Sequence, residues 1–138
     1  LSLYGLAALG TIGIAALYVF GPVPMPYHRE ILEREGTTLT PGLEAVLTAL
    51  CRILGAGLMA SGISALLFAL AIQASDPLLI KMRPLLIGLI VGLPCVIYPR
   101  RVETLTGVRT PWRPAVALIA VMLAGFVASV LLSHRQFM

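Results

Sequence analysis

Three stretches of the chain carry no charged side chain over a length that matches the thickness of a lipid bilayer. They run from Ser2 to Phe20, from Ile53 to Ile72 and from Pro114 to Leu132. An α-helix needs roughly 20 mostly apolar residues to cross the ~30 Å hydrocarbon core. A fourth apolar stretch, Pro84 to Tyr98, is shorter, so we expect its helix to begin before Pro84 or the bilayer to thin around it. The sequence predicts an all-α integral membrane protein, a bundle of four transmembrane helices in one domain over residues 1–138.

Composition excludes a water-soluble domain of this size. Of the 138 residues, 59% are hydrophobic and 12% are charged, whereas soluble domains are about 45–50% apolar and about 25% charged. The net charge of +4 comes from basic residues that flank the apolar stretches, where anionic lipid headgroups attract them. We therefore expect membrane lipids, and no nucleic acid, as partners of these charges.

Helix breakers divide the chain into four predicted spans with short connections. We expect the spans at about 2–20, 43–72, 79–98 and 114–132, and we interpret the first as a retained helix rather than a cleaved signal peptide. Gly21 and Pro22 end the first span, because glycine is flexible and proline lacks an N–H donor.

The connections have their own local signals. Between the first two spans, His28 to Gly36 predicts a short interfacial helix with Arg29/Glu33 and Glu30/Arg34 at i, i+4 spacing. Thr40–Pro41 and Thr110–Pro111 both resemble a helix N-cap followed by proline at the first helical position. We expect turns or loops over 73–83 and 99–113, and a kink at Pro94.

Basic residues are distributed unevenly between the two sides of such a bundle. Four crossings place the connections after the first and third spans on one side, with Arg29, Arg34, Arg52, Arg100, Arg101, Arg109 and Arg113, and leave Lys81, Arg83 and Arg135 on the other. The positive-inside rule then predicts that both termini lie outside the cytoplasm. The excess of arginine over lysine, with much Ala, Gly and Leu, is typical of GC-rich bacterial genomes, and we expect a bacterial inner membrane.

Small residues at helix-packing spacing are the commonest motif inside the spans. The sets are Gly57, Ser61 and Ala65 in the second span, Gly88 and Gly92 in the third, and Ala120, Ala124 and Ala128 in the fourth. Such faces let helix backbones approach closely and gain dispersion contacts. They predict packing within the bundle or against another subunit.

Few polar side chains lie at positions where they could form a site. Arg52 shares a helix face with Glu44 and Thr48, and the two hypotheses are a guanidinium that snorkels to water and a buried arginine in a polar cavity. His28 is a further candidate for the same polar site; we interpret it as an interfacial polar residue, and the alternative is contact with a partner protein or a quinone head. Arg100, Arg101, Arg109 and Arg113, with Trp112 at the level of the aromatic belt, are expected to contact lipid headgroups or a partner.

No cofactor or metal is expected. Cys51 and Cys95 fall near the same end of the bundle, but without a C-x-x-C pattern we interpret them as structural thiols. His28 and His134 are predicted to lie on opposite sides of the membrane, and neither has another ligand at metal-binding spacing.

Three functional hypotheses remain, and the first is a non-catalytic accessory or structural subunit of a larger, possibly energy-transducing, membrane complex. The second is a small homo-oligomeric channel or transporter with Arg52, Glu44 and Thr48 in its vestibule. The third is an interfacial enzyme acting on lipid or quinone, with His28, Glu30, Glu33 and the Arg100/Arg101 pair as its polar groups. The apolar middle of every span argues against a proton-coupled carrier.

Overall fold

The computed structural model describes residues 2–73 and 75–135, with side chains up to Leu132, and every element in this part of the chain is an α-helix. The helices are α1 (Leu3–Phe20), α2 (Pro26–Arg34), α3 (Pro41–Ala71), α4 (Leu78–Thr106) and α5 (Trp112–Arg135). Of these, α1, α3, α4 and α5 are long and apolar enough to span a membrane. The predicted all-α membrane bundle with a short additional helix is thereby confirmed.

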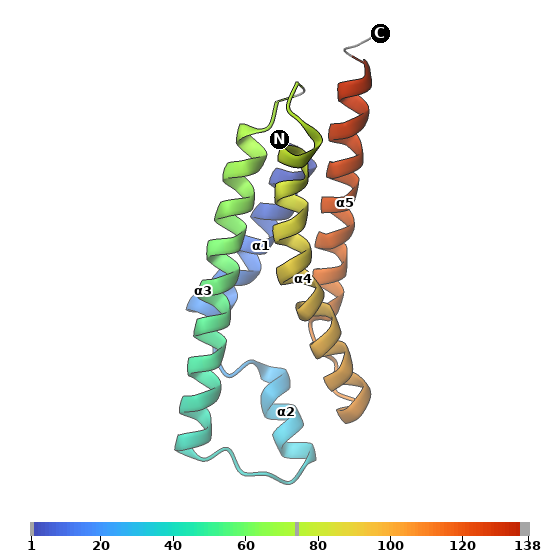
Figure 1. Cartoon of the computed structure of the whole chain (residues 1–138). Helices are drawn as coiled ribbons and strands as arrows, with labels where there is room; N and C mark the ends of the chain where they lie inside the picture. The colour runs from blue at the N-terminus through green and yellow to red at the C-terminus, as the bar shows by residue number, and fades with distance from the viewer. Residues whose placement is uncertain (1, 74, 136–138) are drawn as a thin grey trace.

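The four long helices form a ring in the order α1, α3, α4, α5 (Figure 1). The contacts between α1 and α3 are the most extensive, followed by those between α4 and α5, while α1–α5 and α3–α4 contacts close the ring. Figure 1 shows the start of α1 and the end of α5 at one end of the bundle, which we call the terminal end, and α2 at the other, the α2 end. The lower halves of α3 and α4 diverge, and α2 lies between them.

Glycines of α3 bring it close to α1. A Cβ built on Gly62 would lie 2.8 Å from Ile12 Cγ1 and 3.3 Å from the Ala8 carbonyl oxygen, and one on Gly55 would lie 2.9 Å from the Val19 backbone nitrogen. Any side chain here would push the helices apart and weaken the dispersion contacts that hold helices together in a bilayer.

The tightest packing lies toward the terminal end. The central cluster consists of Tyr4, Ala7, Ala8, Ala65, Leu85 and Met122. The Tyr4 hydroxyl donates to the Lys81 carbonyl oxygen at 2.9 Å, so α1 and α4 are joined there by a hydrogen bond as well as by packing. Lys81, which the sequence placed in a turn, lies in the first turn of α4 with its side chain 3% exposed.

α4 begins at Leu78, close to the predicted start of the third span, but is longer than predicted at its C-terminal end. It includes Pro84, Pro94 and Pro99 and continues to Thr106, so the expected loop over 99–113 is wrong for its first half. Gly107, at φ 68°, ends the helix with its N–H bonded to the Glu103 carbonyl oxygen, a left-handed cap that glycine adopts without strain. Each internal proline removes one backbone donor but leaves the rest of the helical ladder in place.

The two Thr–Pro sequences behave differently. Thr40 accepts a hydrogen bond from the Leu43 N–H at 3.3 Å, with Pro41 at the first helical position, which confirms the predicted cap. Thr110 instead donates its hydroxyl to the Pro99 carbonyl oxygen at 2.7 Å, and α5 begins at Trp112. The Thr110 side chain is thus bonded to α4 and not to the first turn of α5, so the expectation of a second Thr N-cap is wrong.

Candidate functional site

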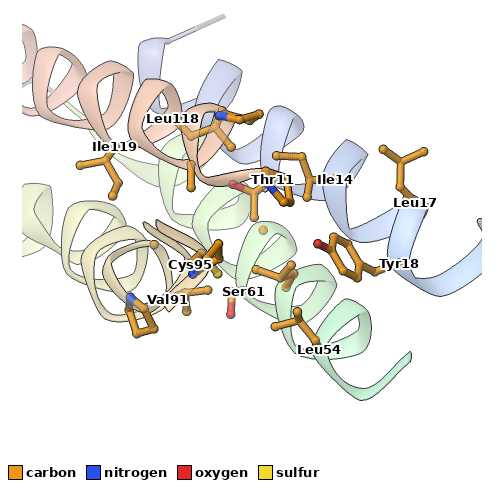
Figure 2. Close-up of a pocket in the computed structure, with 18 of the residues that line it drawn as sticks. Thr11, Ile14, Leu17, Tyr18, Leu54, Ser61, Val91, Cys95, Leu118 and Ile119 are labelled. Atoms are coloured by element: carbon orange, nitrogen blue, oxygen red, sulfur yellow. The ribbon is translucent and has the colours of Figure 1, made fainter. Parts of the chain in front are cut away.

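A cavity of about 750 Å³ occupies the α2-end half of the ring. Figure 2 shows side chains of all four long helices around it, among them Thr11 and Tyr18 of α1, Ser61 of α3, Val91 of α4 and Leu118 of α5. Its walls are mostly apolar and include small residues of three helices: Ser61, Gly62, Ala65, Gly88, Gly92 and Ala115. Toward the terminal end the cavity stops at Ala65 and Met122, two members of the central cluster.

The wall becomes polar at the α2 end of the cavity, which we call the mouth. Tyr27 and Glu30 of α2, Tyr98 of α4 and Arg109 of the α4–α5 loop lie there. The hydroxyls of Tyr18 and Tyr27 approach to 3.4 Å, and burial raises the pKa of Tyr27 above its ordinary value. The Tyr27 phenol therefore stays neutral, and the two hydroxyls can serve as hydrogen-bonding groups.

α2 is attached to the helices on either side of the mouth. Arg29 forms an ion pair with Glu44 at the start of α3 at 3.2 Å, and Arg34 donates to the Thr106 carbonyl oxygen at the end of α4 at 3.5 Å. Arg34 also pairs with Glu30 at 2.8 Å, as the i, i+4 spacing predicted, whereas Arg29 bonds to Glu44 and not to Glu33. These partly exposed contacts are individually weak, but together they hold α2 across the gap between α3 and α4.

His28 stabilises the first turn of α2. Its Nδ1 accepts the Met25 backbone N–H at 3.1 Å, which satisfies a donor at the helix start. Burial lowers the pKa of His28 below its ordinary value, so the ring is neutral and carries its proton on Nε2.

The three residues of the predicted polar site have separate partners. Arg52 Nη1 donates to the Tyr18 carbonyl oxygen at 3.3 Å, near the C-terminus of α1, where a cation complements the helix dipole. Glu44 pairs with Arg29, and His28 bonds to Met25. The three side chains therefore contact different segments: Arg52 contacts the end of α1, Glu44 contacts α2, and His28 contacts the residue that precedes α2.

Glu103 organises the loop between α4 and α5. One carboxylate oxygen accepts from the Thr110 N–H at 2.9 Å and from Trp112 Nε1 at 3.0 Å, and the other pairs with Arg113 at 3.0 Å. Val108 is fully buried and Thr110 is 4% exposed. The loop is therefore held at two points, with Arg109 between them.

Arginines and Trp112 form a band around this end of the bundle. The guanidinium carbon of Arg113 lies 4.8 Å from the Trp112 ring centroid and that of Arg100 lies 5.4 Å from it, distances typical of cation–π contacts. Arg100, Arg101 and Arg109 are exposed. This arrangement suits a membrane–water boundary.

The predicted packing residues occupy different environments. Gly88 and Gly92 face Met122 and Ile119 of α5, and Ser61 and Ala65 line the cavity. Gly57 is exposed, and a Cβ built on it would meet nothing within 4 Å. Ala120 and Ala124 are exposed on α5, and Ala128 lines a smaller cavity of about 390 Å³ at the terminal end.

Both cysteines are free: Cys51 is buried, and Cys95 lines the large cavity. Within the part of the chain that the structure describes, no three His, Cys, Asp or Glu side chains gather as metal ligands would. The side chain of His134 lies outside the described residues.

Sequence reasoning did not single out Tyr18, Tyr27, Tyr98 or Glu103. The available signal was weak: an aromatic residue near a span end is typical of membrane proteins in general. Comparison with models of known protein families, with curated proteins and with solved structures finds no match to this chain.

Proposed function

We propose that this protein binds the hydrocarbon chain of an amphiphilic molecule from the bilayer, without catalysing a reaction on it. The observation that carries the proposal is the cavity of about 750 Å³ that is lined by all four helices that can span a membrane. Its volume falls in the range of ligand sites, roughly 300–1,000 Å³, which are mostly apolar with a few polar groups.

The shape of the cavity supports a chain-like ligand. Ile87 and Pro99 of α4 both line it, and at 1.5 Å per residue these positions mark a length of about 18 Å along the helix. The apolar part ends at the central cluster and the polar part at the mouth. An amphiphile would place its chain between the helices and its polar group among Tyr27, Tyr98 and Arg109.

The enzyme and channel hypotheses receive less support from this geometry. Two of the acid–base candidates, His28 and Glu30, are engaged with Met25 and Arg34. The central cluster borders the inner end of the cavity, so the polar groups of the mouth do not continue through the described part of the bundle.

A cavity-filling substitution tests the proposal. We expect Val91→Phe, which adds a ring to the cavity wall, to reduce the amphiphile that co-purifies with the protein about tenfold, because the ring occupies the space of the chain. Ile90→Phe is the matched control, since Ile90 is 73% exposed on the same helix. The measurement is mass spectrometry of lipids extracted per mole of protein, with thermal unfolding to verify that both variants fold. Equal retention by Val91→Phe and the unchanged protein would refute the proposal.

A second candidate, the accessory subunit, is favoured by a different observation. The face of α3 opposite α1 exposes Ala49, Ala56 and Ala60, although lipid-facing positions have no need of small side chains. A membrane-spanning helix of another subunit would pack against this face. The two roles are compatible, because the cavity lies inside the ring and this face outside it.

We further propose that the α2 end faces the cytoplasm in a bacterial inner membrane, and that the termini lie on the opposite side. The support is the number of arginines at the α2 end.

A further inference from the structure

The cavity has a polar mouth, and the charges there favour one class of ligand. Three ion pairs at the α2 end join Arg29 to Glu44, Arg34 to Glu30 and Arg113 to Glu103. Among the described side chains, Arg52, Arg100, Arg101 and Arg109 are not in such pairs, against Glu33 and Glu35 on the acidic side. The mouth of the cavity is therefore surrounded by more positive than negative charge.

Of these four arginines, Arg109 is the one that lines the cavity. It lines the mouth together with Glu30, whose carboxylate is already paired with Arg34 at 2.8 Å. Glu30 is thus largely neutralised, and Arg109 has an exposed side chain. A guanidinium at this position can donate two parallel hydrogen bonds to a phosphate or carboxylate.

The loop presents Arg109 at a defined position. Val108 before it is fully buried, and Thr110 after it is bonded to Glu103 and to the Pro99 carbonyl oxygen. A residue between two anchored neighbours loses little backbone freedom on binding, which favours affinity. The Tyr27 and Tyr98 side chains in the same wall add neutral hydrogen-bonding groups beside it.

We infer that the ligand is an anionic amphiphile, whose hydrocarbon chain lies in the cavity and whose phosphate or carboxylate binds Arg109. The inference rests on the proposed chain-binding function and adds the chemistry of the head. An acidic phospholipid and a free fatty acid share this chemistry.

The test compares ligands that have one acyl chain and different heads. Delipidated protein in an uncharged detergent is titrated with a lysophosphatidic acid, a fatty acid, a lysophosphatidylcholine and a monoacylglycerol of the same chain length, and binding is followed by native mass spectrometry. We expect the two anions to bind about tenfold more tightly than the uncharged and zwitterionic ligands, the usual effect of a charge-assisted hydrogen bond. The stronger of the two anions identifies a phosphate or a carboxylate as the preferred head.

Three arginine variants assign the effect to one position. Arg109→Gln should abolish the preference for anions, and Arg109→Lys should keep part of it. Arg101→Gln removes an equal charge from an exposed residue at the same end that does not line the cavity, and it should leave the preference unchanged.

The outcomes separate the two proposals. Equal binding of all four ligands, lost in Val91→Phe, would overturn the anionic head and leave chain binding in place. An anion preference that survives Arg109→Gln would also overturn the inference, because the charge would then act from elsewhere. Binding of none of the four would overturn the proposed function itself.

Discussion

The imidazole of His28 accepts a hydrogen bond from a backbone N–H at the start of α2. The Met25 N–H is bonded to His28 Nδ1 at 3.1 Å, which requires a lone pair on that nitrogen and therefore a neutral ring or the loss of the bond. Burial lowers the pKa of His28 in the folded protein. Because the folded pKa is below the unfolded value of about 6.5, the stabilisation is fully present above the unfolded pKa and is lost as pH falls through the folded one.

Acidification should thus loosen the first turn of α2. We expect the hydrogen-exchange protection of the amides of residues 25–30 to fall about three- to tenfold between pH 7.5 and pH 5.5, as the loss of one hydrogen bond implies. His28→Gln is the control, because a glutamine at this position can accept the same bond without titrating, and its protection should not change. If the glutamine variant loses protection to the same extent, another group is responsible.

α3 has two faces of small residues with different roles. Gly55, Gly62 and Ala65 are buried on one face, where Gly55 and Gly62 contact α1. Ala56 and Ala60 on the opposite face are exposed. A small-residue motif in the sequence predicts helix packing. Only the tertiary structure shows which motif contacts a helix of the same chain and which one is exposed.

The exposed face of α3 should be where another subunit packs. We expect the double variant Ala56→Leu/Ala60→Leu to release the chain from heavier membrane proteins in native mass spectrometry of mildly extracted membranes, because the larger side chains prevent close approach of a helix. Ile90→Phe, which enlarges an exposed side chain of α4 outside the small-residue motifs, should leave the assembly intact. Isolation of the unchanged protein as a lone chain at native expression would contradict the prediction, and a homo-oligomer would identify the neighbour as a second copy.

α4 shows where local sequence signals mislead. The sequence predicted a loop from Pro99, yet the helix continues to Thr106 and stops at Gly107. The last turns are supported from outside the helix, since Thr110 bonds to the Pro99 carbonyl oxygen and Glu103 binds the loop. Contacts between segments thus outweigh the cost of a missing donor, and a window of sequence cannot contain them.

The whole bundle is asymmetric along its axis. The terminal end is closed by the central cluster, while the α2 end holds the cavity mouth, α2 and the band of arginines with Trp112. By the positive-inside rule, we expect the arginine-rich end on the cytoplasmic side. The orientation of the bundle therefore decides which leaflet supplies the ligand.

Reporter fusions test this orientation. We expect alkaline phosphatase, which is active only outside the cytoplasm, to be active when fused after Met138 and inactive when inserted in the α2 segment at Gly36. Green fluorescent protein at the same two sites should give the opposite pattern. Activity of the phosphatase at Gly36 would show that the bundle is inserted the other way and would place the cavity mouth in the outer leaflet.

The sequence by itself determined the class of fold, the number of long helices and the cap at Thr40, because these depend on the local length of apolar runs and on hydrogen bonds between residues three positions apart. Only the tertiary structure decided the cavity, the burial of Lys81 and the position of Arg109. The cavity is lined by Ser61, Val91 and Leu118, which lie on three different helices and do not fill the space between them, and Arg109 reaches it because Glu103 and the buried Val108 hold its loop. These properties depend on distances between segments far apart in the chain, which residue order does not specify without the packing of the helices.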